Sequence, residues 1–288
     1  GTDHYHLNQR VTGFSQKGDE VRVHTTQGLC LNCDLLVCAD GIGSDARRWL
    51  LGHTPANYAG YIAWRGIISA AEVSAETFDL LKDAIIYHIG PDYHLLTYPI
   101  PVVEESLNNQ ERYVNWLWYR NVPLGKQLDE LMTDKDNQQR TLSVSPGTVR
   151  EEAITQLKSD AAAVPDLLAE LIIQTDQPFI QAVFDYEIPQ MAFGRICVMG
   201  DAAFSARPHT AAGTAKAAEE ARQLGLALQE CDQNIPEALK IWEAHQLTLG
   251  RNLVQRNREA GTKLQNGRWP VGAPLAFGLY EKGDSVMV

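Results

Sequence analysis

The segment 195–229 constrains the fold most, because its periodicity changes from that of a strand to that of a helix around a polar loop. The apolar run 196–199 predicts a buried strand that ends at Gly200 and Asp201. Beyond the loop, apolar residues recur at spacings of three and four, as on one helix face. These positions are Ala217, Ala218, Ala221, Leu224 and Leu228. The segment therefore predicts a strand, a loop large enough for a ligand, and a helix.

The loop carries groups that suit an anion or a polar cofactor. Asp201, at the carboxyl end of the strand, can accept hydrogen bonds from the vicinal hydroxyls of a sugar or polyol. The amides of 210–214 lie at the start of the helix, where free N–H groups favour negative charge. Gly213 lets the backbone approach a ring closely because it has no side chain. The alternative is an ordinary strand-loop-helix corner in which Asp201 only caps the helix.

The sequence GDAAFSARPHTAAGTAKAAEEA, residues 200–221, resembles the second flavin motif of the FAD-dependent aromatic-ring monooxygenases. The resemblance implies that Gly200 and Asp201 bind a hydroxyl of the FAD chain. It also implies that the turn and the helix start face the pyrimidine edge of the flavin, through Pro208, Ala212, Gly213 and Thr214. The run 208–213 is similar to the branch that hydroxylates pyridines, such as 2,6-dihydroxypyridine 3-monooxygenase.

A second motif, ADGIGSDARRWL, lies at residues 39–50. Its glycine spacing also fits a dinucleotide fingerprint, but 59–65 lacks the acidic residue that a NAD site needs. The motif resembles the ADGxxSxxR sequence of the same family, which implies that Asp40 and Gly41 close over the FAD pyrophosphate. Arg47 suits a bidentate phosphate contact. An independent Rossmann site, a plain turn and a solvated arginine are the alternatives.

The middle of the chain differs in its residue composition, which predicts a sheet. Its strands are rich in aromatic and β-branched residues, and their length favours an antiparallel sheet with one covered face. The predicted strands are 58–69, 84–89, 93–99, 112–119 and 179–187. Amphipathic helices are predicted at 151–162 and 165–173. In the family that this chain resembles, such a segment is the substrate domain.

Side chains that could line a substrate pocket come from these strands. Alternation places Tyr61, Ala63 and Arg65 on one face of their strand. The candidates for stacking on or hydrogen bonding to a hydroxylated ring are Arg65, His88, His94, Tyr98, Trp116 and Trp118. For each of them, sheet packing or a solvated tip is the alternative.

Three residues are predicted to take part in catalysis, namely Arg65, Tyr98 and His209. His209 lies beside the flavin turn, where an imidazole tunes charge or helps to deprotonate a phenol-like substrate. A positioning role is the alternative for His209. The neighbouring Arg207 is a candidate contact for an anionic substrate or a phosphate.

The resemblance implies an α/β (α+β) fold of the p-hydroxybenzoate hydroxylase type, with FAD-binding elements and a mainly antiparallel substrate sheet. We expect a partial FAD-binding domain at 1–57, a substrate domain at 58–188, a second FAD-binding segment at 189–230 and C-terminal helices at 231–288. The remaining patterns predict strands at 7–14 and 21–25 and a helix from Asn234 to about Asn257. Loops are expected at Gly261, Gly267 and Pro270.

The resemblance also implies the reaction. FAD, reduced by NAD(P)H, activates O2 for transfer of a hydroxyl group to an electron-rich aromatic or N-heteroaromatic ring. A related flavin oxidoreductase that does not hydroxylate and an interaction module that has lost the cofactor are the alternatives. The family begins with a βαβ unit whose GxGxxG holds the ADP half of FAD, and no such unit precedes Gly1 in this sequence. We therefore expect one part of a longer chain, and weak FAD binding by 1–288 alone.

Composition excludes other partners. The net charge of −11 argues against nucleic acid and anionic membrane surfaces. No stretch approaches the roughly 18 apolar residues of a membrane span, so the cytoplasm is expected. Five cysteines fit reduced thiols, and Cys30, Cys33 and Cys38 lack the fourth ligand of a zinc site, so no metal is expected. The sequence is compatible with a homodimer.

Overall fold

The computed structural model describes residues 4–100, 112–270, 272–275 and 277–279. The chain divides into two compact units. Unit 1 comprises Gly1–Asn57, Phe184–Ala260 and Pro274–Val288, and unit 2 comprises Tyr58–Val183 and Gly261–Ala273. The chain first passes from unit 1 to unit 2 between Asn57 and Tyr58, and the substrate domain is predicted to begin at residue 58. Residues 184–188, predicted for that domain, lie in unit 1.

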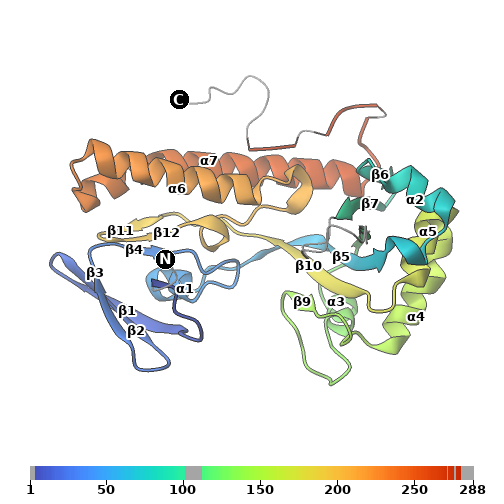
Figure 1. The fold of residues 1–288 in the computed structure, drawn as a ribbon, viewed down its shortest axis with the longest axis horizontal. Helices are drawn as coiled ribbons and strands as arrows, with labels where there is room; N and C mark the ends of the chain where they lie inside the picture. The colour runs from blue at the N-terminus through green and yellow to red at the C-terminus, as the bar shows by residue number, and fades with distance from the viewer. Residues whose placement is uncertain (1–3, 101–111, 271, 276, 280–288) are drawn as a thin grey trace. The chain divides into compact units, whose positions relative to one another are not determined.

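A small three-stranded sheet forms the centre of unit 1. β12 (Ile196–Val198) pairs antiparallel with β11 (Ala192–Phe193) and parallel with β4 (Leu36–Cys38). All three residues of β12 are buried, as expected for an unbroken apolar run in a strand that is covered on both sides. Figure 1 shows α6 (Gly213–Glu230) and α7 (Ile235–Gln265) side by side along this sheet.

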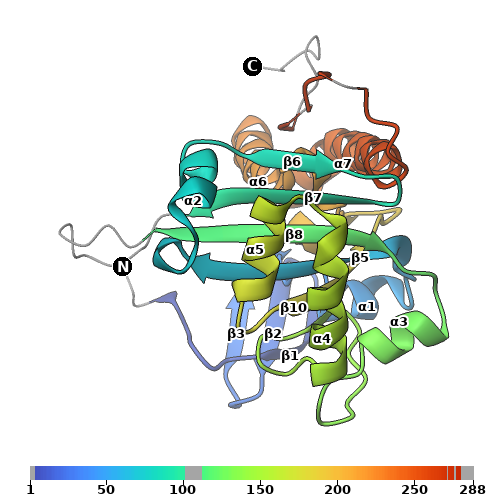
Figure 2. The ribbon, with the colours of Figure 1, turned by 90° about the vertical axis from the view of Figure 1, so that its right-hand side faces the viewer.

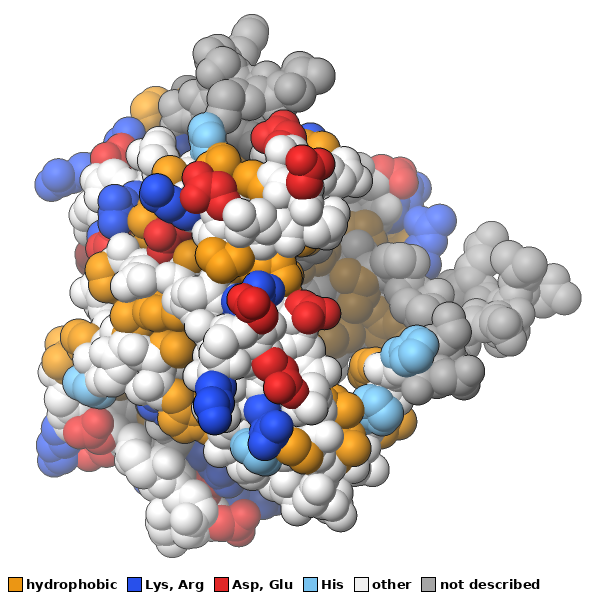
Figure 3. All heavy atoms as spheres, turned by 90° about the vertical axis from the view of Figure 1, so that its left-hand side faces the viewer, with side chains coloured by type: hydrophobic (Ala, Val, Ile, Leu, Met, Phe, Trp, Pro, Cys, Tyr) orange, Lys and Arg blue, Asp and Glu red, His pale blue; other side chains and the backbone are white. Residues whose placement is uncertain are grey.

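A second sheet of unit 1 is an antiparallel meander of β1 (Val11–Lys17), β2 (Glu20–Thr25) and β3 (Cys30–Cys33). The strand predicted at 7–14 lies at Val11–Lys17 in the structure. It extends up to the turn at Gly18, because Lys17 pairs with Glu20 across that turn. Figure 3 shows acidic and basic side chains interspersed on the surface in view. The negative net charge is therefore not concentrated in one patch of the described surface in this view.

Unit 2 is built on a six-stranded sheet with the order β6-β7-β8-β5-β10-β9. The strands are β5 (Asn57–Ser69), β6 (Ile86–Ile89), β7 (Tyr93–Ile100), β8 (Tyr113–Asn121), β9 (Ser143–Val144) and β10 (Phe179–Asp185). The pairs β5/β8, β6/β7, β7/β8 and β9/β10 are antiparallel. The predicted mainly antiparallel sheet is thus confirmed.

Helices cover one face of this sheet. Figure 2 shows α4 (Glu151–Asp160) and α5 (Asp166–Gln174) lying across the strands. Trp116 on β8 donates from Nε1 to Thr175 Oγ1, at 2.9 Å, just beyond the end of α5. Arg120 on the same strand forms an ion pair with Asp160 at the end of α4. Two short helices, α2 (Ala75–Leu81) and α3 (Lys126–Leu131), complete the unit.

The long helix α7 shows where one sequence expectation is wrong. A loop was expected at Gly261, but α7 continues to Gln265. Gly261 and Leu264 are both buried, and they continue the spacing of the buried Val254 and Asn257. A buried stripe that continues along the helix therefore outweighs the low helix propensity of a single glycine. Of the predicted C-terminal segment, 271, 276 and 280–288 lie outside the described residues.

Among the described residues, no helix combines the length and the apolar character that crossing a bilayer would require.

Candidate functional site

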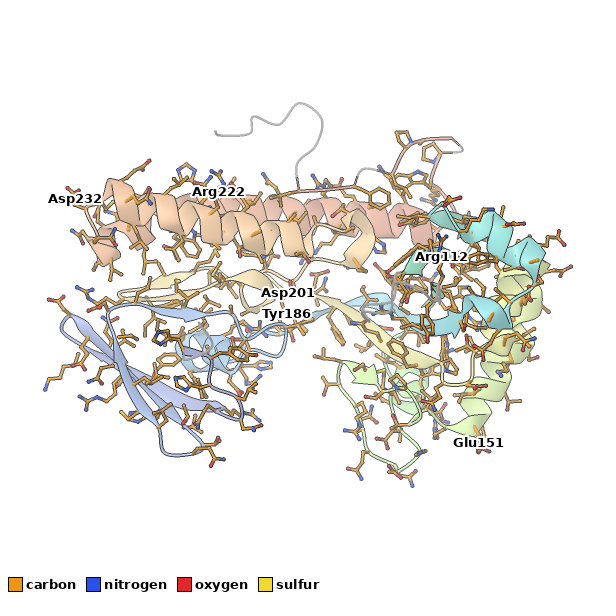
Figure 4. All side chains as sticks on the ribbon, in the orientation of Figure 1. Arg112, Glu151, Tyr186, Asp201, Arg222 and Asp232 are labelled. Atoms are coloured by element: carbon orange, nitrogen blue, oxygen red, sulfur yellow. The ribbon has the colours of Figure 1, made fainter. Side chains whose placement is uncertain are left out.

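The sharp turn after β12 presents Asp201 to solvent. Gly200 has a φ of +63°, a left-handed conformation that glycine adopts without a steric penalty. A 3-10 turn, Gly200–Ala202, follows directly, and Asp201 is its exposed member. Figure 4 labels Asp201 on the strand side of α6. The end of a buried strand therefore places a carboxylate at the surface of unit 1.

Asp201 lies next to the start of α6. A Cβ atom built on Gly213, the first residue of α6, would lie 4.0 Å from Asp201 Oδ1. The N-cap is Ala212, and no side chain of the described residues caps α6. Gly213 and Thr214 are exposed. The site thus combines a carboxylate acceptor with uncapped N–H groups at the positive end of a helix, which suits a ligand with hydroxyl groups and negative charge.

The turn between these two elements is held by α7. The amide of Thr210 donates to Asn257 Oδ1 at 3.0 Å, and Asn257 Nδ2 donates to Thr210 Oγ1 at 2.9 Å. Pro208–Thr210 forms a 3-10 turn, and Ala211 follows with a φ of +52°. A non-glycine residue in this region costs on the order of 1 kcal/mol, so the turn is held against a local strain. His209 is only 6% exposed, and burial favours the positioning alternative for its ring.

The second motif caps helix α1 (Asp45–Leu51). Asp40 accepts from Ser44 Oγ at 2.5 Å and from the amide of Ala46 at 3.1 Å. Ser44 Oγ in turn accepts from the amide of Arg47 at 2.9 Å. Asp40 is exposed and Gly41 is partly buried, and Gly41 has a φ of +77°. The predicted pyrophosphate residues are therefore pre-ordered by the start of α1.

Arg47 joins the two motifs. Its side chain is 2% exposed and donates to the carbonyl oxygens of Ala202 at 2.8 Å and Ile42 at 2.6 Å. Its guanidinium lies 4.2 Å from the ring centroid of Tyr186, and burial lowers its pKa. The side chain is thus not solvated on the helix surface, and it ties the loop after β4 to the turn at Asp201. A phosphate contact by Arg47 stays a prediction.

A groove of about 530 Å³ adjoins this second motif within unit 1. It is large enough for a nucleotide-sized group. Residues of β1, β4, α1 and the loop between β4 and α1 line it, including Phe14, Val37, Asp40, Gly43 and Trp49. The edge of β4 away from β12 has no paired strand among the residues that the structure describes.

One face of the unit 2 sheet carries a group of tyrosines, of which Tyr61 and Tyr119 are 2% exposed. Strand alternation and register place Tyr61, Tyr87, Tyr98 and Tyr119 on the face opposite α4 and α5. Arg65 lies on the same face, where its Nη1 donates to Gln181 Oε1 at 2.9 Å. This face therefore combines aromatic rings with hydroxyl and guanidinium groups.

His94 is fully buried on this face. Its ring stacks on Tyr119, with centroids 4.4 Å apart and planes inclined by 13°. His94 Nδ1 lies 2.5 Å from Gln265 Oε1, and Gln265 Nε2 donates to Asn121 Oδ1 at 2.8 Å. Burial lowers the pKa of His94 to about 4, so the ring is neutral at pH 7.

The six residues predicted as candidates for pocket lining lie on two opposite faces of the sheet. Arg65, His94 and Tyr98 share the tyrosine face. His88, Trp116 and Trp118 point to the helix-covered face, because successive residues of a strand alternate between faces. For these three the sheet-packing alternative holds.

Asn115 is a residue that the sequence argument missed. It precedes Leu117 and Tyr119 on the same face of β8 and is 4% exposed. Its Nδ2 has no hydrogen-bond partner among the described residues, and neither does Nε of Arg65. Counting back from Tyr119 by twos would have placed Asn115 on this face, but no sequence pattern indicates an unpartnered amide.

Comparison with known proteins finds relatives whose names refer to FAD, to monooxygenation or to hydroxylation. A family model described as "FAD binding domain-like" matches residues 58–185. The 2,6-dihydroxypyridine 3-monooxygenase of Paenarthrobacter nicotinovorans is 33% identical over 281 residues, covering 97% of this chain and 70% of the relative. The FAD-dependent urate hydroxylase of Klebsiella pneumoniae is 28% identical over 261 residues, covering 90% of this chain and 59% of the relative. This chain thus spans well under two thirds of the second relative.

A solved structure agrees with the sequence comparison. The 2,6-dihydroxypyridine-3-hydroxylase of Arthrobacter nicotinovorans superposes with a TM-score of 0.91 at 32% identity, covering all of this chain and 72% of that one.

The fold and the site together define a flavoprotein of the aromatic hydroxylase type. The chain belongs to the FAD-dependent aromatic-ring monooxygenase family. The predicted family, its α/β fold and FAD as its cofactor are confirmed. The predicted roles of individual site residues stay predictions.

Proposed function

We propose that this chain is part of an enzyme that hydroxylates an aromatic or N-heteroaromatic ring with FAD, NAD(P)H and O2. The observation that supports it most is the proximity of Asp201 Oδ1 to the uncapped start of α6 at Gly213. FAD carries a polyol chain, which needs an acceptor, and a ring edge that becomes anionic on reduction, which needs N–H donors. The residues present fit both groups.

In this proposal, each motif holds a different part of the cofactor. Asp201 accepts from a hydroxyl of the FAD chain, and the Gly213 and Thr214 amides face the pyrimidine edge of the flavin. Pro208 and Ala212 shape the turn that brings these amides into place, while Asp40 and Gly41 approach the pyrophosphate. Bound FAD, once reduced by NAD(P)H, would supply the electrons that activate O2 for the hydroxylation. The protein excludes water and orients the ring.

The substrate, in this proposal, binds against the tyrosine face of unit 2. Tyrosine rings and the Arg65 guanidinium suit stacking on a planar ring. Asn115 Nδ2 and Arg65 Nε are donors without a partner among the described residues, and a buried unpaired donor is unfavourable by roughly 1–3 kcal/mol. A ring that carries hydroxyl, phenolate or lactam oxygens would satisfy these donors. This supports an oxygenated aromatic or pyridine-type substrate over an apolar one.

Direct involvement of His209, Tyr98 and Arg65 in catalysis remains a proposal. Tyr98 and Arg65 lie on the tyrosine face, from which a hydroxyl or guanidinium can reach a bound ring. A cytoplasmic location and a homodimer are further predictions of the sequence.

Oxygen-isotope labelling tests the proposed reaction. The full-length protein would be supplied with 18O2, NADH or NADPH and a panel of hydroxypyridines and phenols. We expect substrate-stimulated NAD(P)H oxidation with one labelled oxygen atom in the product. Stoichiometric hydrogen peroxide with an unlabelled product, for every compound that binds, would instead indicate a flavin oxidoreductase that does not hydroxylate.

A further inference from the structure

A fully buried ion pair lies in α6 beneath the Asp201 turn. Lys216 Nζ and Glu220 Oε1 are 2.9 Å apart, and both side chains are 0% exposed. The two residues are one helical turn apart, and the surrounding core includes Cys197, Val198 and Trp242. Trp242 Nε1 donates to the carbonyl oxygen of Glu220 at 2.8 Å, which fixes the helix backbone at this point.

Both charged groups also bind a single residue, Gly200. Lys216 Nζ donates to the carbonyl oxygen of Gly200 at 2.9 Å. Glu220 Oε2 accepts from the amide of Gly200 at 2.6 Å. The peptide group that leads from Gly200 into Asp201 therefore has its oxygen held by a lysine, while the preceding amide is held by a glutamate.

Stability alone does not account for this arrangement. Removing two charges from water is costly, and replacing a buried ion pair by apolar side chains of similar size is often neutral or stabilising. Burial raises the pKa of Glu220, against the opposing effect of Lys216. The negative charge of Asp201 acts in the same direction as burial. The pair is thus better explained by the geometry that it imposes on Gly200 than by a net contribution to folding.

We propose that Lys216 and Glu220 are positioning residues that fix the Gly200–Asp201 peptide, so that the Asp201 carboxylate faces the start of α6. The inference rests on the proposed function, because it assigns Asp201 to the FAD chain. The pair itself does not touch the cofactor. It acts through the direction of one peptide group, and without it the left-handed Gly200 is free to rotate Asp201 away from Gly213.

The test compares FAD affinity with stability in the full-length protein. The double substitution K216M/E220L replaces the pair by apolar side chains. We expect the unfolding transition of the apoprotein to stay unchanged or to rise, while the Kd for FAD, measured by flavin fluorescence, increases about tenfold, the size of one lost hydrogen bond. The control is K126M/E130L, because Lys126 and Glu130 have the same i, i+4 spacing on the surface of α3. The control should leave the Kd for FAD unchanged.

A double-mutant cycle with D201N separates positioning from a general structural role. If the pair acts through Asp201, D201N should weaken FAD binding strongly in the wild-type background and by less than about threefold in K216M/E220L. Fully additive effects, or an unchanged Kd in a folded K216M/E220L protein, would overturn the inference. An unchanged Kd in D201N alone would instead refute the proposed FAD site, so the two failures are distinguishable.

If K216M/E220L does not fold, E220Q provides the test. Its carboxamide keeps an oxygen acceptor for the Gly200 amide but removes the charge. We expect E220Q to lower stability while the Kd for FAD stays within about threefold of wild type, because the hydrogen-bond geometry is retained. A fall in FAD affinity that matches that of D201N would contradict the proposed geometry.

Discussion

Asp201 Oδ1 lies 4.0 Å from the position that a Cβ atom on Gly213 would occupy. The end of a buried strand and the first residue of a helix therefore lie next to each other at the same site, although a loop separates them in the chain. This relationship explains why a carboxylate and a residue without a side chain occur together. The carboxylate supplies an acceptor, and the missing side chain leaves room beside it.

Loss of the Asp201 charge should weaken FAD binding. A hydrogen bond to a charged acceptor contributes about 1.5–3 kcal/mol, so D201N is expected to raise the Kd for FAD roughly 10- to 100-fold. The Kd is measured by fluorescence titration of the apoprotein. D83N, which changes an exposed carboxylate of unit 2, is the matched control. Equal affinities for D201N and D83N would contradict the assignment of Asp201.

Asn115 should affect the substrate and not the cofactor. N115L replaces the amide by an apolar group of similar size and removes the unpartnered donor. We expect the Kd of an oxygenated ring substrate to rise about tenfold, the equivalent of one hydrogen bond, with no change in the Kd for FAD. Substrate-induced changes in the flavin spectrum report the first value. Unchanged substrate binding in N115L would show that Asn115 does not contact the ring.

Much of the fold could be predicted because the local spacing of apolar residues determines its strands and helices. The strand at 196–198, the helix from Gly213 and the long strands of unit 2 all follow from the spacing of apolar residues. The displaced start of β1 and the continuation of α7 beyond Gly261 could not be predicted in this way. Pairing across a turn and burial along a long helix decide them, and both are tertiary effects.

His94 makes the stability of the protein depend on pH. Its pKa is about 4 in the folded state, below that of an exposed histidine, so the unfolded state binds a proton first as the pH falls. The stabilisation from neutral His94 is present above about pH 6.5 and is lost between about pH 6.5 and 4, amounting to about 3 kcal/mol.

The variant H94F isolates this effect, because phenylalanine retains the stack on Tyr119 but does not titrate. Urea unfolding at intervals from pH 7 to pH 4 should show a steeper loss of stability in the wild-type protein than in H94F. Parallel curves for the two proteins would contradict a buried neutral histidine.

Asp185 connects three segments of unit 1. It accepts from Asn57 Nδ2 at 3.2 Å, from Arg207 Nε at 2.9 Å and from Arg258 Nη2 at 2.5 Å. Its side chain is fully buried. Arg207, predicted to meet an anionic substrate or a phosphate, thus has a carboxylate partner within the protein.

Substitution of Asp185 should therefore be strongly destabilising. D185N removes the buried carboxylate charge that Arg207 and Arg258 bind, and we expect the free energy of unfolding to fall by about 3 kcal/mol. E187Q is the control, because Glu187 is exposed and, among the described residues, forms an ion pair with Arg258. This control should cost less than about 1 kcal/mol. Similar values from urea unfolding of the two variants would refute the role of Asp185.

The residues that build the site could be predicted only in part. Asp201 and Gly213 were identifiable because their sequence context resembles a known flavin motif. Lys216 and Glu220 were not, because a lysine and a glutamate at helical spacing are usually an exposed pair. The contact that Arg47 makes with the turn at Asp201 could not be predicted either, because its partner Ala202 is remote in the sequence. Local patterns do not specify which distant carbonyl or amide a charged group will bind.

The central claim is that a ligand must approach the backbone at Gly213, and two glycine substitutions in α6 test it. A Cβ atom on Gly213 would make an ordinary contact with Asp201, whereas one on Gly225 would meet nothing within 4 Å. Alanine at either position should stabilise the helix by up to about 1 kcal/mol.

The decisive measurement is the Kd for FAD of G213A relative to G225A in the full-length protein. We predict that both variants are at least as stable as wild type, and that G213A alone binds FAD at least tenfold more weakly, because the new methyl group occupies space beside Asp201. Equal FAD affinities for two folded variants would contradict the account.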